Sequence, residues 1–212
     1  MKKQILALLA IFTFGAFLFT SCETDDAVIN TPADAFIDLG DEFDPMEGVT
    51  VDNGNLEDVE HDFTPSFDNK KVNHYVLTYT LGQVTATRNV YVRANNIAGN
   101  YTVNDVVTGY EAGTYNYNVT VDFLTAGDPA DRYNKLILRE FSAYMPLRDF
   151  TVTIDGTHIT LPPTQPDGWL GTLEGSGTFK EDSDGNFSIV NITYNYSDDD
   201  ESGTGIATFS RQ

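Results

Sequence analysis

The residues most often used for acid–base catalysis and metal binding are few in this chain. Its 212 residues include three histidines, His61, His74 and His158, and no two of them have the spacing of a metal-ligand pair. The Gly-x-Ser-x-Gly motif of a serine nucleophile and the glycine-rich phosphate loops do not occur. We therefore predict no catalytic residues, no cofactor and no enzymatic activity.

Carboxylates are abundant, with 32 Asp and Glu against 12 Lys and Arg. Two carboxylates at the right separation could hydrolyse a glycosidic bond, but that separation is a property of the folded chain. Most of the acids fall in predicted turns, where a solvated charge is the ordinary interpretation.

One turn has the alternating oxygen donors of a calcium-binding loop. Asp182, Asp184 and Asn186 stand at every second position, but Thr193 occupies the twelfth position, where such a loop has Glu. An exposed hairpin turn is the preferred interpretation. We predict no metal site and keep these three residues only as a weak Ca²⁺ candidate.

Aromatic side chains offer a way to bind a ligand. Trp169, the single tryptophan, lies in a segment rich in Pro and Gly. It could stack on a sugar ring or anchor a protein contact, because its face buries a large area per rotatable bond; it could equally close the end of a barrel. Tyr110, Tyr115 and Tyr117 form a second group near a predicted turn, with burial in a strand as the alternative. These four residues are our predicted contacts to a ligand or partner.

The N-terminus reads as an export signal. Lys2 and Lys3 precede an uncharged apolar stretch of 15 residues, 5–19, which is shorter than the roughly 20 that span a membrane. The stretch ends in Leu18-Phe19-Thr20-Ser21-Cys22 and resembles a bacterial lipobox. The resemblance implies cleavage after residue 21 and lipidation of Cys22, with two or more acyl chains giving a stable anchor. An ordinary cleaved signal peptide is the alternative.

An acidic cluster follows the cysteine at Glu23, Asp25 and Asp26. It resembles the export signal of surface-exposed lipoproteins in Bacteroidetes-type bacteria, which implies display on the outside of the outer membrane. A plain solvated tether over residues 22–33 is the alternative.

The charge and the cysteine content exclude several classes of protein. The formal net charge is −20, and it becomes −22 when residues 1–21, with Lys2 and Lys3, are removed. Nucleic acid needs clustered Lys and Arg, so it is not an expected partner. With a single Cys, the chain cannot form an intramolecular disulfide or a thiolate metal cluster.

Alternation of period two and frequent turn residues predict an all-β protein with a break near residues 93–99. For residues 34–94 we predict strands at Ala35–Leu39, Glu47–Val51, Val72–Leu81 and Val84–Arg93. The opening Asp44-Pro45-Met46-Glu47-Gly48-Val49 and the closing Thr87-Arg88-Asn89-Val90-Tyr91-Val92 resemble a small bacterial immunoglobulin-like domain. The resemblance implies a β-sandwich, although residues 55–68 fit it poorly.

Residues 95–212 contain eight strand candidates with mostly short connections, which suggests an up-and-down barrel or a meander. They are Gly99–Val106, Tyr115–Leu124, Lys135–Phe141, Phe150–Asp155, His158–Leu161, Gly171–Lys180, Asn186–Tyr196 and Gly203–Ser210. The opening Ile97-Ala98-Gly99-Asn100-Tyr101-Thr102-Val103 and the closing Gly203-Thr204-Gly205-Ile206-Ala207-Thr208-Phe209 resemble the lipocalin-like β-domain of Bacteroides surface lipoproteins. Many of those lipoproteins are encoded with SusC/SusD-type nutrient importers.

Together these features predict a non-catalytic, lipid-anchored protein on the outside of the outer membrane. The resemblance implies an accessory component of a SusC/SusD-type complex that takes up glycan or peptide. An adhesion or structural lipoprotein, and a lipocalin-like carrier of a small apolar molecule, are the alternatives.

Overall fold

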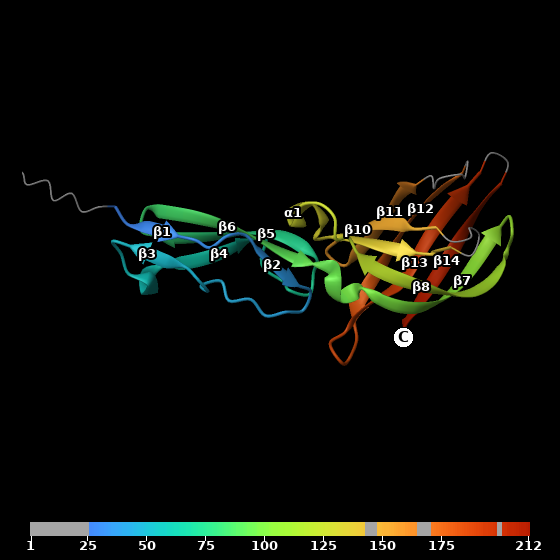
Figure 1. Cartoon of the computed structure of the whole chain (residues 1–212), viewed down its shortest axis with the longest axis horizontal. Coiled ribbons are helices and arrows are strands. Elements are labelled where there is room, and N and C mark those ends of the chain that lie inside the picture. Colours follow the sequence, from blue (N-terminus) through green and yellow to red (C-terminus); the bar gives the residue numbers. More distant parts are fainter. Residues whose placement is uncertain (1–25, 143–147, 165–170, 199–200) are drawn as a thin grey trace, which may run out of the picture.

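The computed structural model describes residues 26–142, 148–164, 171–198 and 201–212. The chain folds into two β-rich parts that follow each other along one long axis, an N-terminal region and a barrel (Figure 1). The prediction of an all-β protein is confirmed. No helix among the described residues is long and apolar enough to cross a membrane.

Two sheets make up the N-terminal region. Its strands are β1 (Val28–Asn30), β2 (Ala35–Asp38), β3 (Thr50–Asp52), β4 (Glu60–Thr64), β5 (Asn73–Leu81) and β6 (Val84–Arg93), with a short 3₁₀ helix, η1, at Leu56–Asp58. One sheet has the order β2-β6-β5-β4, with β2 parallel to β6, and the other pairs β1 with β3. The predicted hairpin of β5 and β6 is present, with the pair Leu81 and Val84 flanking its turn.

Three features of this region differ from the sequence prediction. Strand β1 lies inside the segment predicted as a tether, because Ile29 is buried against the core. Strand β4 was not predicted, since it is an edge strand whose side chains, apart from the half-buried Phe63, are exposed. The strand predicted at Glu47–Val51 begins only at Thr50, because a turn with Gly48 at a φ of 75° precedes it.

The second part is a closed barrel of eight antiparallel strands. The strands are β7 (Gly99–Gly109), β8 (Gly113–Phe123), β9 (Lys135–Arg139), β10 (Phe150–Asp155), β11 (His158–Thr164), β12 (Thr172–Glu181), β13 (Phe187–Ser197) and β14 (Ser202–Arg211). Each pairs with the next along the chain, and β14 pairs with β7 to close the ring. The predicted up-and-down barrel is confirmed, and the open meander is excluded.

Alternation along the barrel strands separates an apolar inner face from a polar outer face. Ring contacts fill the inside: Phe141 lies 5.5 Å from Tyr194 and 5.9 Å from Phe209, measured between ring centroids. Glycines on β14 make room for large rings, because a Cβ on Gly205 would lie 2.1 Å from the ring of Tyr194.

The outer face is divided into two halves of different charge. Seventeen exposed residues of β7 (100–108), β8 (114–120), β13 (193–197) and β14 (202–210) form what we call the uncharged wall, since all are Thr, Asn or Ser apart from Val106 and Ile206. The partly exposed Asp122, the next outward residue of β8, borders the wall and pairs with Arg139 of β9. The other half, on β9 to β12, carries Lys135, Arg139, Asp155, Glu174 and Lys180.

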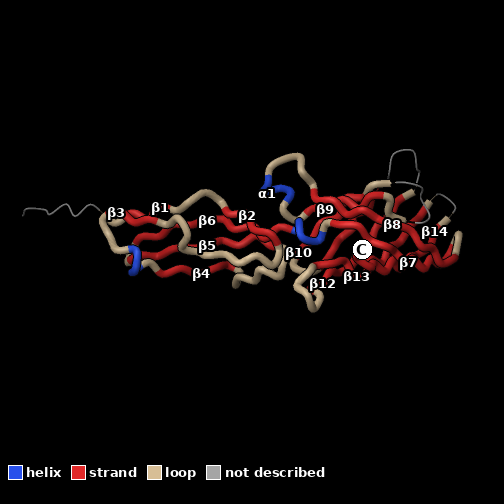
Figure 2. Tube along the Cα trace, turned by 60° about the horizontal axis from the view of Figure 1, so that its bottom comes forward, coloured by secondary structure: helices blue, strands red, loops and turns tan. Residues whose placement is uncertain are grey.

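A 3₁₀ helix, η2 (Ala94–Ile97), connects the N-terminal region to the barrel, and the α1 turn (Pro129–Arg132) lies beside the junction (Figures 1 and 2). Backbone hydrogen bonds cross this junction between Val72 and Gly156 and from Ala94 N–H to the Tyr133 carbonyl. The ring of Tyr133 also packs 5.2 Å from that of Tyr91. The two parts are therefore joined by main-chain pairing as well as by the connecting chain.

Candidate functional site

The end of the barrel that lies farthest from the N-terminal region is the first candidate region, and we call it the distal end (Figure 1). Because the strands run up and down, the last residues of β7, β9, β11 and β13 and the first residues of β8, β10, β12 and β14 gather there. The predicted contact residues Tyr110 and Tyr115 belong to this end. Trp169 belongs to the β11–β12 connection and lies outside the described residues.

Tyr110 is at the tip of the β7–β8 hairpin, and its side chain is 45 % exposed. Its N–H donates to the Ser202 carbonyl at 3.2 Å, and its carbonyl accepts from the Tyr196 hydroxyl. A hydrogen bond to the Glu201 carboxylate raises the pKa of Tyr110. These contacts tie the β7–β8 tip to the β13–β14 tip while Tyr110 stays partly exposed.

Tyr115 and Tyr117 do not share that exposed position. Tyr115 is half-buried, and its hydroxyl donates to the Glu111 carbonyl at 2.8 Å, so the side chain folds back over its own turn. Tyr117 points into the barrel, where its hydroxyl donates to Asp105. The three tyrosines grouped by sequence therefore occupy three environments: a rim, a turn and an interior.

The interior holds a buried carboxylate that the sequence analysis did not single out. Asp105 has no exposed surface, and its Oδ2 accepts hydrogen bonds from Tyr117 Oη at 2.9 Å and from Tyr194 Oη at 2.7 Å. Among the described residues, no donor reaches its Oδ1. The signal was available, because Asp105 stands at an inward position of β7, between Val103 and Val107.

The interior environment fixes the protonation of the two phenols. Burial, and then the negative charge of Asp105, raise the pKa of both Tyr117 and Tyr194 far above the usual range for tyrosine. Both hydroxyls therefore remain protonated donors at physiological pH. Asp105 is thus a fully buried acceptor held by two hydroxyl donors. The buried Ser142, which follows β9 at the distal end, lies close to them.

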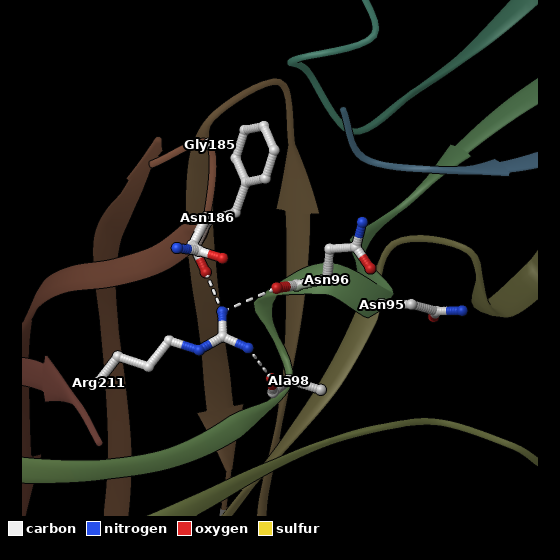
Figure 3. A pocket seen from close by; sticks show the side chains of 7 residues that line it. Asn95, Asn96, Ala98, Gly185, Asn186 and Arg211 are labelled. Carbon is white, nitrogen blue, oxygen red and sulfur yellow. Dashed lines mark hydrogen bonds between the residues drawn. The ribbon is translucent and has the colours of Figure 1, made fainter. Parts of the chain in front are cut away.

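A polar pocket of about 370 Å³ lies at the opposite end of the barrel, next to the junction (Figure 3). Arg211 crosses it, and its Nη atoms donate to the carbonyls of Asn96 at 2.9 Å, Ala98 at 2.7 Å and Phe187. The guanidinium thus joins η2 to β13 and β14. Because three main-chain oxygens already hold it, we assign Arg211 a structural role.

The weak calcium candidate forms a self-contained turn between β12 and β13. Asp182 Oδ1 accepts hydrogen bonds from the N–H groups of Asp184 and Asn186, both at 2.9 Å. The bond from Asn186 is the main cause of a lowered pKa for Asp182. Within the described part of the chain, no group of three or more His, Cys, Asp or Glu side chains is placed to hold a metal ion.

The remaining predicted residues are placed as follows. Cys22, Glu23 and Asp25 lie outside the described residues, and Asp26 is exposed at the start of the described chain. His74 stacks on Tyr91 at 4.6 Å and its Nε2 lies 2.9 Å from Asn89 Oδ1, whereas His61 and His158 are exposed on β4 and β11. The histidines lie on three different strands, in separate environments.

Comparison with known proteins adds no assignment, since no protein-family model matches the sequence and no curated protein matches it.

Proposed function

We propose that the chain is a non-catalytic lipoprotein anchored through Cys22 to the outside of the outer membrane of a Bacteroidetes-type bacterium. It acts as an accessory component of a SusC/SusD-type complex that takes up glycan or peptide, by binding the ligand or a protein of the complex. The observation that carries this proposal is the opposite placement of β1, the first described strand, and the distal end along the long axis (Figure 1). A lipid on Cys22 would hold the distal end away from the membrane.

The N-terminal region has the features of a spacer in this proposal. Its two sheets, one of four strands and one of two, support the immunoglobulin-like resemblance in part. The main-chain hydrogen bonds across the junction would transmit its orientation to the barrel. A rigid spacer presents a binding surface at a defined height, whereas a flexible one does not.

The barrel interior favours binding at the rim over carriage of an apolar molecule. Phe141 packs edge-to-face against Phe150 at 6.1 Å and against Tyr194, and stacks on Phe209. These rings come from different walls, so side chains occupy the space that an apolar ligand would need. The partly exposed Tyr110, together with Trp169 of the β11–β12 connection, which lies outside the described residues, would supply the aromatic contacts in this proposal.

Purification of the tagged, full-length protein from native membranes tests the assignment. We expect a large outer-membrane transporter to co-purify, and we expect Tyr110→Ala combined with Trp169→Ala to reduce its recovery or the affinity for glycan or peptide at least tenfold. Phe123→Ala is the matched control, because Phe123 is 42 % exposed but lies at the other end of β8.

Recovery of the protein alone, with no affinity for glycan or peptide, would overturn the importer assignment and favour an adhesion or structural role. If Phe123→Ala reduces transporter recovery or ligand affinity as much as Tyr110→Ala combined with Trp169→Ala does, the distal end is not the binding site.

A further inference from the structure

The uncharged wall differs from the rest of this acidic protein in having no charged side chain. The protein carries 44 ionisable Asp, Glu, Lys and Arg side chains and a net charge of −20, yet none of these belongs to the seventeen residues of the wall, all of which are described. The opposite half of the barrel, built from the same kind of strand, does carry charges. Depletion of charged residues is the compositional mark of the centre of a protein interface.

The centre of the wall is apolar. Val106 on β7 and Ile206 on β14 are directly paired across the seam that closes the barrel, and they are 43 % and 50 % exposed. The barrel is closed, so these strands offer no free edge for main-chain pairing. A partner can therefore reach this surface only through side chains.

Cross-strand hydrogen bonds hold the polar side chains around that centre in place. Thr108 Oγ1 lies 2.7 Å from Thr204 Oγ1, and Asn104 Nδ2 donates to Asn116 Oδ1 at 3.0 Å. Such side chains lose little further rotamer freedom on association, which lowers the entropic cost of binding.

We propose that the uncharged wall is the contact face of a weak homodimer of this chain. Each Thr, Ser and Asn carries both a donor and an acceptor, so a two-fold related copy can satisfy these groups without any opposite charge. Two copies of net charge −20 repel each other, and a face without carboxylates keeps that repulsion farthest from the contact. The paired Val106 and Ile206 of one copy would pack on the same pair of the other.

The small size of the wall predicts a dimer of low affinity. A standard interface uses about 20–30 residues from each side, so seventeen residues on a convex barrel correspond to a small, transient contact. Two aliphatic side chains also provide no ring face for a sugar, which favours a second copy over a glycan as the occupant.

Sedimentation analysis of residues 22–212 with Cys22→Ser tests the dimer without lipid or an intermolecular disulfide. The dimer fraction is expected to rise with protein over about 10–500 µM, and to rise further with added salt, because salt screens the repulsion between copies while no ion pair at the wall is weakened. Ile206→Lys is expected to reduce the dimer fraction at least tenfold.

Thr160→Lys is the matched control, since Thr160 is an exposed β-branched residue on β11, in the charged half of the barrel. Thr160→Lys should leave the dimer fraction unchanged. Ile206→Lys and Thr160→Lys should both unfold at the same temperature as the unsubstituted protein. As a positional test in the same Cys-free background, Val106→Cys should form a disulfide-linked dimer under oxidation and Thr160→Cys should not.

A parent protein that stays monomeric throughout, or a dimer that survives Ile206→Lys, overturns the proposal. So does a monomer whose affinity for a neutral glycan is lost in Ile206→Lys, because the wall would then be a glycan surface. These results are independent of the importer assignment, which rests on the distal end.

Discussion

Val72 and Gly156 exchange two backbone hydrogen bonds across the junction between the N-terminal region and the barrel. Val72 N–H donates to the Gly156 carbonyl at 3.0 Å, and Gly156 N–H donates to the Val72 carbonyl at 2.9 Å. Val72 precedes β5 and has no exposed surface, while Gly156 forms the β10–β11 turn. A loop of the barrel thus extends the hydrogen bonding of the N-terminal region.

This bridge depends on a backbone conformation that favours glycine. Gly156 has a φ of 61°, and a Cβ there would meet nothing within 4 Å, so substitution tests conformation without a steric clash. We expect Gly156→Val to lower the free energy of unfolding by about 1–2 kcal/mol more than Gly156→Asn, because Asn tolerates this region. Calorimetry should show two separated transitions in the Val variant. Identical melting curves for the two variants would show that the bridge does not couple the two parts.

Because Asp105 is buried, the stability of the barrel should depend on the tyrosine hydroxyls that donate to it. Tyr194→Phe removes one of two donors to Asp105 and should lower the free energy of unfolding by about 1–3 kcal/mol, measured by denaturant titration. Tyr115→Phe is the control, because its hydroxyl bonds a carbonyl at the exposed turn, and it should cost less than about 1 kcal/mol. If Tyr194→Phe lowers the free energy of unfolding no more than Tyr115→Phe does, Asp105 does not depend on the Tyr194 hydroxyl.

Alkaline pH should unfold the protein through the same residues. The pKa of Tyr117 and Tyr194 is raised in the folded chain above the unfolded value of 10.0, so the folded state keeps protons that the unfolded state releases. Stability is therefore fully present below about pH 10 and falls above it, by up to about 1.4 kcal/mol per pH unit for each tyrosine. Denaturant titrations from neutral to strongly alkaline pH measure this slope. A double Tyr117→Phe, Tyr194→Phe variant should show a shallower slope, and an unchanged slope would assign the effect to other groups.

Arg211 should matter more than its exposed position suggests. Arg211→Met removes the bonds to the Asn96, Ala98 and Phe187 carbonyls and should lower the free energy of unfolding by about 1–3 kcal/mol. Arg139→Met is the comparison, since the exposed pairs of Arg139 with Asp122 and Asp149 should contribute under about 1 kcal/mol. Equal thermal shifts for the two variants would argue against the structural role of Arg211.

The predicted lipobox and the acidic cluster after it make separate predictions, one about membrane anchoring and one about display on the cell surface. Cys22→Ser should abolish incorporation of labelled fatty acid and release the protein from the membrane, because in the proposed function acyl chains on Cys22 supply the anchor. Changing Glu23, Asp25 and Asp26 together to Ala should preserve lipidation but make the protein resistant to protease added to intact cells. Lipid labelling that persists in Cys22→Ser would refute the lipobox, and unaltered protease sensitivity would refute the export signal.

The sequence by itself determined the class of the fold and most of its strands. In the barrel, alternation placed all eight strands, because each buries one face and the inner positions of a closed sheet must be apolar. It missed β1 and β4 in the N-terminal region, because a three-residue strand and an edge strand bury few side chains.

Only the tertiary structure decided which side chains meet. Asp105 and Tyr194 are 89 positions apart, and Val106 and Ile206 become neighbours only when β14 pairs with β7. The sequence gives the inward or outward parity of each residue, but ring closure sets the strand neighbours and the register between them. For this reason Tyr110, Tyr115 and Tyr117 were grouped along the chain, whereas in the fold each faces a different environment.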